Sequence, residues 1–338
     1  METADSTYGS DKDGLVCGYL FVPGQTATPI DADAAADWLA APVQSPTDSF
    51  VWLNFSLANA ASERWIRRHL ALPETSLESL HGDIGSTRLE QDGDALVAVI
   101  HDVLFDFTFD PGSVSTVSLC VEPSFLLSAR LRPLRSVDRL RASVKTGQTF
   151  RSSADLLGHL LRDQADVLVN IVRQSTSRVD FIEDRMLADR ISTSRRDLGS
   201  LRRTLVRLQR LLAPEPAALF RLLSRPPAWI GGEDLQDLRH AAEEFSAAVV
   251  DSGALVERVK LLQEELAAQV NEQTNRTLFI LTVVTVLALP INLIAGLFGM
   301  NVGGIPLAEH RHGFRMVVLP LLALTVLLGY MALGRHRD

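Results

Sequence analysis

The chain has 338 residues, a formal net charge of −8, 46% hydrophobic residues and a mean hydropathy of +0.12. This hydropathy is high for a soluble chain, so the composition indicates a protein divided between water and a membrane. The two cysteines, Cys17 and Cys120, lie far apart with no CxxC or CxxH neighbour. The cysteines therefore indicate neither a disulfide framework nor a structural zinc site.

The first part of the chain, 1–130, is predicted to be a cytosolic α/β domain. Its opening residues are acidic and polar and contain no apolar stretch typical of a secretory signal. Runs rich in Val, Phe, Leu and Ile predict strands at 15–22, 50–57, 87–91, 94–110 and 115–129. Helices are expected at 31–40 with an Asp as N-cap, at 62–72 before Pro73, and in the short segment PETSLESL. Strands interleaved with helices indicate a sheet covered by helices.

Long helices are predicted for the cytosolic helical region 131–232, because apolar residues recur three and four apart from Ser136 onward. Prolines and a Gly-Gly pair are expected to break these helices between about 213 and 232. No proline follows until Pro290, so the stalk 233–276 should form one helix with the segment after it. Gly253, in its middle, is a candidate for a local bend.

Two membrane helices are predicted at the C-terminal end, at 277–298 and 316–334. The first has no charged residue or histidine, and its 22 residues would reach roughly 33 Å, enough for a hydrocarbon core of about 30 Å. Basic residues precede the first span and follow the second, although Arg311 and Arg315 in the loop 299–315 weaken this bias. We therefore expect the loop on the outer side of the membrane, a cytosolic tail at 335–338, and both termini on the cytoplasmic side.

One face of the first membrane helix carries a polar stripe. Steps of three and four residues select Asn271, Asn275, Leu278, Thr282, Thr285, Leu289, Asn292, Gly296 and Gly299. Off-stripe positions are bulky hydrocarbon. One copy cannot enclose a channel, so the stripe predicts a homo-oligomer whose first membrane helices line a pore, with rings of leucine able to gate it by dewetting.

The alternative is that the small and hydroxyl-bearing residues of the stripe only pack helices together, as they do in many membrane proteins. The pore interpretation is favoured because the stripe continues into Asn271 and Asn275 and ends at the tripeptide Gly299-Met300-Asn301.

The run LPINLIAGLFGMNVGGIP, followed by a second apolar span, resembles the CorA-type divalent-cation transporters, and VGGIPLAEHRHGF is similar to their ZntB zinc-transporter branch. The resemblance implies a homopentamer with a cytosolic funnel of long helices and two membrane helices per subunit. It also implies a selectivity motif at Gly299, Met300 and Asn301, with Asn301 forming the outer ring that meets the ion. Its pore positions fall on Leu278, Thr285, Leu289 and Asn292. Zinc would be the cargo, with coupling to protons, and no resident cofactor is expected.

Two further features have alternative interpretations. Glu309, His310 and His312 are either transient zinc ligands or ordinary exposed loop residues. The stalk carries ten acidic and four basic residues, which either concentrate cations at the inner mouth or form a solvated helix face.

Other functional classes receive less support. The sequence contains no G-x-x-x-x-G-K, G-x-S-x-G, H-E-x-x-H or strand-linked G-x-G-x-x-G motif, so an enzyme is not predicted. The Arg-rich stretch 130–225 lacks interleaved aromatic residues, which argues against nucleic-acid binding. Two alternatives remain: a Mg²⁺, Co²⁺ or Ni²⁺ transporter of the same architecture, and a membrane-anchored scaffold without transport.

Overall fold

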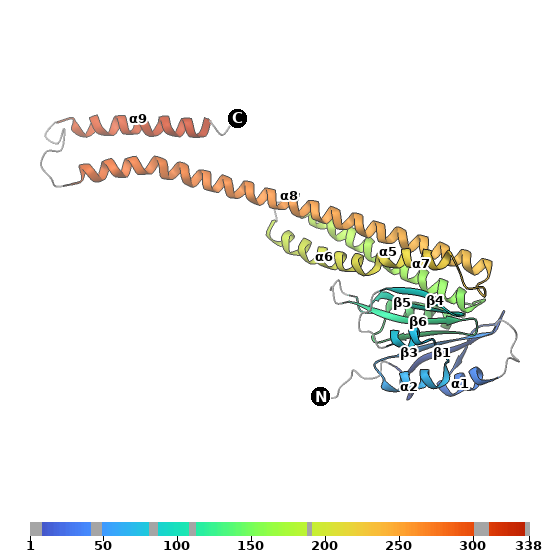
Figure 1. Cartoon of the computed structure of the whole chain (residues 1–338). Coiled ribbons are helices and arrows are strands. Elements are labelled where there is room, and N and C mark those ends of the chain that lie inside the picture. Colours follow the sequence, from blue (N-terminus) through green and yellow to red (C-terminus); the bar gives the residue numbers. More distant parts are fainter. Residues whose placement is uncertain are drawn as a thin grey trace. The chain divides into compact units, whose positions relative to one another are not determined.

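The chain divides into two compact units, Met1–Gln263 and Glu264–Asp338. The computed structural model describes residues 9–41, 49–80, 87–107, 113–187, 191–300 and 311–334. Figure 1 shows the elements of both units. The first unit holds the sheet and most of the helices, and the second holds the end of one long helix and the C-terminal helix.

A seven-stranded sheet forms the centre of the first unit, in the order β2-β1-β3-β7-β6-β5-β4. Its strands are β1 Leu15–Phe21, β2 Thr28–Ile30, β3 Phe50–Ser56, β4 Arg88–Asp92, β5 Ala95–Val103, β6 Val114–Glu122 and β7 Phe125–Arg130. β3 and β7 are parallel, and the other neighbouring pairs are antiparallel. The parallel pair therefore joins an N-terminal and a C-terminal set of strands.

Helices cover both faces of this sheet. On one face lie α1 Ala32–Ala40, α2 Ala60–His69 and α3 Glu74–Ser79. On the other lie α4 Arg135–Lys145, α5 Ser153–Leu187, α7 Pro214–Leu223 and the start of α8 Gly232–Phe298, and α6 Ile191–Leu212 follows α5.

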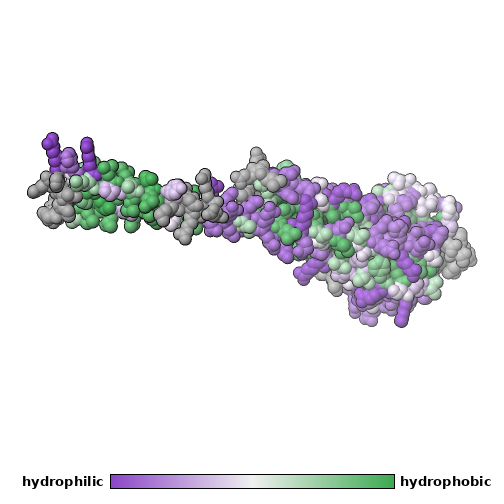
Figure 2. All heavy atoms as spheres, turned by 90° about the horizontal axis from the view of Figure 1, so that it is seen from above, coloured by the Kyte–Doolittle hydropathy of each residue, from purple (hydrophilic) through white to green (hydrophobic). Residues whose placement is uncertain are grey.

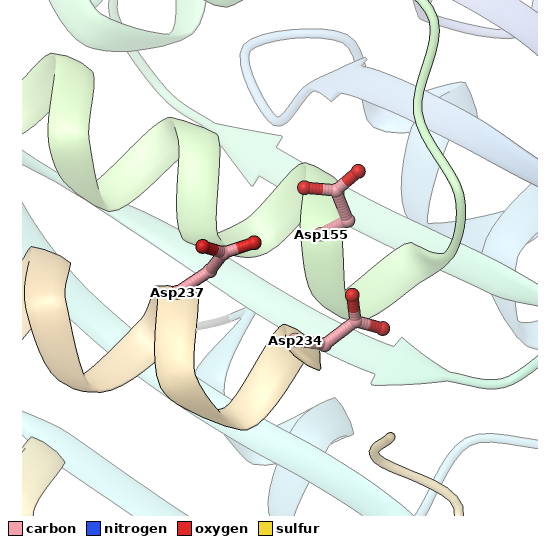
Figure 3. A group of neighbouring side chains, drawn as sticks. All are labelled: Asp155, Asp234 and Asp237. Carbon is pink, nitrogen blue, oxygen red and sulfur yellow. The ribbon is translucent and has the colours of Figure 1, made fainter. Parts of the chain in front are cut away.

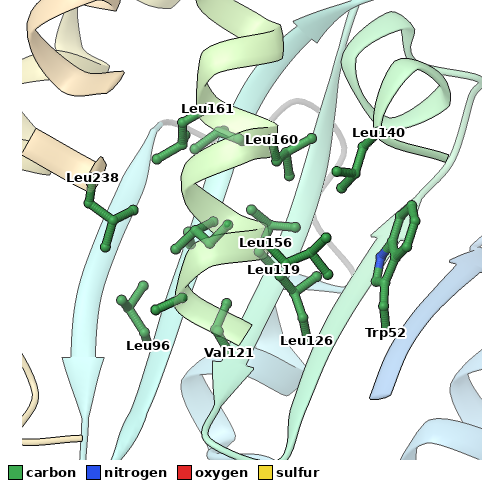
Figure 4. Close-up of a cluster of buried hydrophobic side chains, with 14 of the residues drawn as sticks. Trp52, Leu96, Leu119, Val121, Leu126, Leu140, Leu156, Leu160, Leu161 and Leu238 are labelled. Atoms are coloured by element: carbon green, nitrogen blue, oxygen red, sulfur yellow. The ribbon is translucent and has the colours of Figure 1, made fainter. Parts of the chain in front are cut away.

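The two cores follow from the alternation of side chains along each strand. In β3, Val51, Leu53 and Phe55 belong to one core, whereas Phe50 and Trp52 belong to the other. Figure 4 shows leucines of α5 packed over β5, β6 and β7 in this second core. With both faces covered, β3, β5 and β7 are buried along their whole length.

Most predicted elements of the α/β domain are confirmed. The strands at 15–22, 50–57 and 87–91 correspond to β1, β3 and β4, and the Asp31 side chain caps α1 by accepting a 2.8 Å hydrogen bond from the Ala34 amide.

Three predictions for the α/β domain are wrong in detail. The single strand predicted at 115–129 is a hairpin, since β6 ends at Glu122 and β7 begins at Phe125. The strand predicted at 94–110 ends at Val103. The helix predicted at 62–72 is α2, which begins earlier because the Asn59 side chain caps it through the Ala61 amide at 2.9 Å. The three-residue β2 was not predicted, because it is too short to show a pattern.

The long helix is confirmed as one element of 67 residues, α8. At Gly253 a Cβ atom would lie 2.8 Å from Nε2 of Gln209, so the glycine makes room for a side chain of α6. The predicted break at 213–232 is wrong in part, because Pro214 begins α7, where its missing N–H costs nothing. The C-terminal helix α9, Gly313–Gly334, begins three residues before the predicted start of the second span.

A buried polar network joins the end of β5 to three helices. The Glu215 carboxylate accepts hydrogen bonds from the His101 amide at 2.6 Å and from Gln164 Nε2 at 2.7 Å. Asp102 accepts from the amide of Ser136 at 2.9 Å and from its hydroxyl at 2.9 Å. Burial raises the pKa of Asp102 from 3.8 to about 6, and the nearby Glu215 carboxyl adds to this shift. In the folded protein the protonated form of Asp102 is thus favoured below about pH 6.

The raised pKa of Asp102 predicts a pH dependence of folding. A carboxyl whose pKa is higher folded than unfolded stabilises the fold below pH 4, and this contribution is lost as the pH rises through about 6. Between pH 4 and 7 the wild-type free energy of unfolding should therefore fall by about 2 kcal/mol relative to Asp102→Asn. Urea unfolding of the full chain, followed by tryptophan fluorescence, measures this, since all four tryptophans lie between residues 38 and 229. Parallel pH profiles for the two proteins would contradict the prediction.

Candidate functional site

The last part of α8 and the helix α9 make up the described part of the second unit. From Thr277 to Phe298, α8 carries no charged side chain. Among the described helices, α8 meets the length and composition of a membrane span, and Gly313–Leu328 of α9 is a shorter, mostly apolar segment. Most large side chains on these helices are apolar and exposed, which Figure 2 shows as green surface.

The predicted polar stripe lies on an exposed side of α8. All of its members are exposed, and Leu278 and Leu289 expose 55% and 64% of their area. The members are Asn271, Asn275, Leu278, Thr282, Thr285, Leu289, Asn292, Gly296 and Gly299. The stripe is therefore not covered by any described residue of its own chain.

The opposite side of α8 faces α9. Val283, Leu287, Ile291 and Ile294 are partly buried, and the last two line a groove between the helices together with residues of α9. Ile291 and Ile294 each follow a stripe residue by two positions, which is roughly 200° around a helix. Hydrocarbon thus faces the second helix of the same chain, and the amide and hydroxyl groups face away from it.

The threonine hydroxyls of the stripe are turned toward their own helix. Oγ1 of Thr282 donates to the Leu278 carbonyl at 2.8 Å, and Oγ1 of Thr285 donates to the Leu281 carbonyl at 2.8 Å. Each hydroxyl hydrogen is therefore used, and the oxygen keeps its lone pairs as acceptors. The stripe can accept hydrogen bonds from water, including water bound to a cation.

The predicted selectivity motif begins where α8 ends. The Gly299 amide donates to the Ala295 carbonyl at 2.9 Å, and the Met300 amide donates weakly to the Leu297 carbonyl at 3.5 Å. A Cβ atom on Gly299 would lie 3.1 Å from the Ala295 oxygen, so glycine suits this helix end. Both residues are exposed. Asn301 lies outside the described residues.

Of the candidate zinc ligands in the loop, only His312 lies within the described residues, and Glu309 and His310 lie outside them. His312 is exposed, and its carbonyl accepts a 3.1 Å hydrogen bond from the Met316 amide in the first turn of α9. Its backbone thus starts this helix, while its ring remains accessible.

An acidic cluster that the sequence analysis did not identify lies between the first turns of α5 and α8. Figure 3 shows the carboxylates of Asp155, Asp234 and Asp237, whose oxygens lie within 4.8 Å of one another. The Arg151 guanidinium lies 2.6 Å from Asp237 and 3.2 Å from Asp234, and it also pairs with Glu233 at 2.7 Å. An arginine therefore already supplies the positive charge that three clustered carboxylates need.

The same ion pairs show what some of the acidic residues of the stalk 233–276 do. Glu233, Asp234 and Asp237 pair with Arg151, so these three acids serve to hold α8 against α5. Arg258 of α8 likewise pairs with two acids of α5, at 2.8 and 2.6 Å. The other seven acids of the stalk are exposed: Glu243, Glu244, Asp251, Glu257, Glu264, Glu265 and Glu272.

Comparison with known proteins gives matches over nearly the whole chain. The sequence model of the family described as "CorA-like Mg2+ transporter protein" matches residues 47–335. The divalent cation transporter CmaX of Pseudomonas aeruginosa is 26% identical over 314 residues, which cover 91% of this chain and 92% of the relative. The zinc transport protein ZntB of Yersinia pseudotuberculosis is 23% identical, covering 96% of this chain and 94% of the relative.

Solved structures share the fold. The full-length CmaX structure superimposes with a TM-score of 0.81 at 24% identity, covering 97% of this chain and 99% of that one. The CorA magnesium transporter of Methanocaldococcus jannaschii gives a TM-score of 0.76 at 18% identity, covering 93% and 96%. The soluble α/β part followed by a long helix is therefore a known architecture.

Proposed function

We propose a transport function for this chain from the premise that it belongs to the CorA-like Mg²⁺ transporter protein family, a family of transporters and not of enzymes. In this proposal it moves divalent cations across a bacterial inner membrane through a homopentameric pore. Each subunit crosses the membrane twice, by 277–298 and by 316–334, and keeps both termini in the cytoplasm.

The observation that carries this proposal is the division of α8 into two sides. Its hydrocarbon side faces α9, and its amide and hydroxyl side is exposed over the length of the apolar segment. In a membrane, such a polar side needs water or another polar surface. A ring of identical subunits, each turning its stripe toward the axis, provides a water-filled path and leaves the hydrocarbon side to α9 and lipid.

The chemistry of the stripe suits a hydrated cation. Divalent cations hold their water tightly, and the oxygens of Asn292, Thr285 and Thr282 can accept hydrogen bonds from that water without replacing it. Because neither predicted span contains a carboxylate, the ion would meet no firmly binding group. Asn301 would form the first amide ring, and Leu278 and Leu289 would form narrow apolar rings that can close by dewetting.

Zn²⁺ is the proposed cargo, on the strength of the sequence VGGIPLAEHRHGF, and proton coupling is part of that proposal. Mg²⁺ is the second candidate, favoured by the family that the chain matches. Neither predicted span carries an Asp, Glu, His, Lys or Arg side chain, so a proton carrier of these types would have to lie at one of the two mouths. Flux of each metal into vesicles, with a pH gradient imposed in either direction, separates these cases.

Two matched threonine variants test the orientation of α8. Thr285 of the stripe and Thr325 of α9 each donate a 2.8 Å hydrogen bond to the carbonyl four residues earlier. Replacing either by Val removes the same hydroxyl and the same bond, but only Thr285→Val removes an oxygen from the stripe. Zinc flux in reconstituted vesicles should fall at least about fivefold in Thr285→Val, since the hydrated ion loses at least one hydrogen bond worth about 1 kcal/mol, and should stay unchanged in Thr325→Val. Equal losses in both variants would count against a pore along the stripe.

A second pair of variants separates the amide ring from the loop histidines. Asn301→Ala should lower the rate of zinc uptake at every zinc concentration, including saturation, because the ring of Asn301 amides that receives the hydrated ion is lost. If the two imidazole side chains only attract the ion, the double variant His310→Ala/His312→Ala should lower the rate of uptake at low zinc concentration and leave it unchanged at saturating zinc. Uptake at wild-type rate in Asn301→Ala would refute the role of the amide ring. A scaffold would conduct neither metal in any variant.

A further inference from the structure

The two helices of the second unit leave a groove between them. It has a volume of about 610 Å³, within the range of about 300 to 1,000 Å³ typical of ligand pockets. Its walls are hydrocarbon along both helices, with Ile291, Ile294 and Phe298 on α8 and Val317 and Leu321 on α9. A long apolar ligand fits these walls.

Two polar residues line this groove, Thr325 and Arg311, and only Thr325 has a hydrogen-bond partner among the described residues. The Thr325 hydroxyl already donates to the Leu321 carbonyl at 2.8 Å. Arg311, which precedes α9, is exposed, and none of the described residues pairs with it. The groove thus combines apolar walls with a guanidinium, which pairs well with phosphate.

The position of the groove on α8 indicates what fills it. Leu289, Asn292 and Gly296 of the stripe are each followed two residues later by a groove residue, so the groove opens roughly opposite to the stripe. This step rests on the proposed function: when the stripe faces the axis, neighbouring subunits adjoin the flanks of α8 and the groove faces outward. The bilayer lies on that side.

The arginines near the groove also run against the usual charge bias. Arg311 and Arg315 would lie on the periplasmic side, whereas basic residues are concentrated on the cytoplasmic side of most membrane proteins. A basic residue at a membrane surface attracts anionic lipid headgroups.

We propose that the groove between α8 and α9 binds an acyl chain of an anionic phospholipid of the outer leaflet, with the lipid phosphate paired to Arg311. The lipid would fill the space between the helices and hold α9 beside α8. Arg315, four residues on, is exposed but does not line the groove, so it serves as a matched control.

The test uses the full-length protein in phosphatidylcholine vesicles, with Phe314→Trp as a fluorescent reporter at the groove. A minor fraction of the lipid is brominated in its acyl chains, as phosphatidylglycerol in one set and as phosphatidylcholine in the other. Brominated phosphatidylglycerol should quench the reporter to the same extent at a mole fraction about fivefold lower than that of brominated phosphatidylcholine. Arg311→Gln should abolish this preference, and Arg315→Gln should keep it.

Two results would overturn the proposal. Equal quenching by both lipids would show that the headgroup is not selected. The absence of quenching by either lipid would show that protein, such as a second copy of the chain, fills the groove. Native mass spectrometry of the protein without the reporter gives the same comparison, because bound phosphatidylglycerol should be lost in Arg311→Gln and retained in Arg315→Gln.

Zinc flux in the same vesicles distinguishes the two proposals. Intact flux that depends on Thr285, together with no preference for phosphatidylglycerol, would refute the lipid site and leave the pore standing. A lipid preference that depends on Arg311, together with flux indifferent to Thr285, would refute the axial orientation of the stripe.

Discussion

The structure of the membrane part depends on one constraint: hydrocarbon offers no hydrogen bonds to polar groups. A helix satisfies its own backbone, but the amides of Asn292 and Asn275 and the oxygens of Thr282 and Thr285 remain on one exposed side of α8. The second helix of the chain lies on the other side. The polar side is therefore left for water or for other copies of the chain, and the proposed ring of subunits would satisfy it with both.

The first unit contains the N-terminal part of α8. Both faces of its sheet are buried under helices, and the first turns of α8 belong to one of its two cores. Arg151 and Arg258 join α8 to α5 by ion pairs at two places along the helix.

Features with a local cause could be predicted from the sequence. The period of apolar residues predicted the long helices, and Asp31 predicted a cap that the structure confirms. The polar stripe of α8 could be identified because helix geometry alone places its members on one side. The hairpin between β6 and β7 was missed although Pro123 and Ser124, the two residues between these strands, are a turn signal in the sequence.

Features that depend on distant contacts could not be predicted. The parallel pairing of β3 with β7 and the burial of Glu215 beside His101 bring together residues far apart in the chain. The same is true of the Arg151 cluster, where the spacing within each helix is visible but the contact between α5 and α8 is not. A proline-rich segment was taken as a break, although Pro214 is favourable as the first residue of α7.

The central claim is that one side of α8 faces water within the membrane, and cysteine accessibility measures this most directly. Burial raises the pKa of Cys17 to about 11 and that of Cys120 to about 12, so the native thiols should react little at neutral pH. Single cysteines from Leu278 to Asn292 are then treated in membranes with a water-soluble, membrane-impermeant thiol reagent. The account predicts labelling with a period near 3.6 residues and maxima at Leu278, Thr282, Thr285, Leu289 and Asn292. Uniform labelling, or maxima at Val283, Leu287 and Ile291, would contradict it.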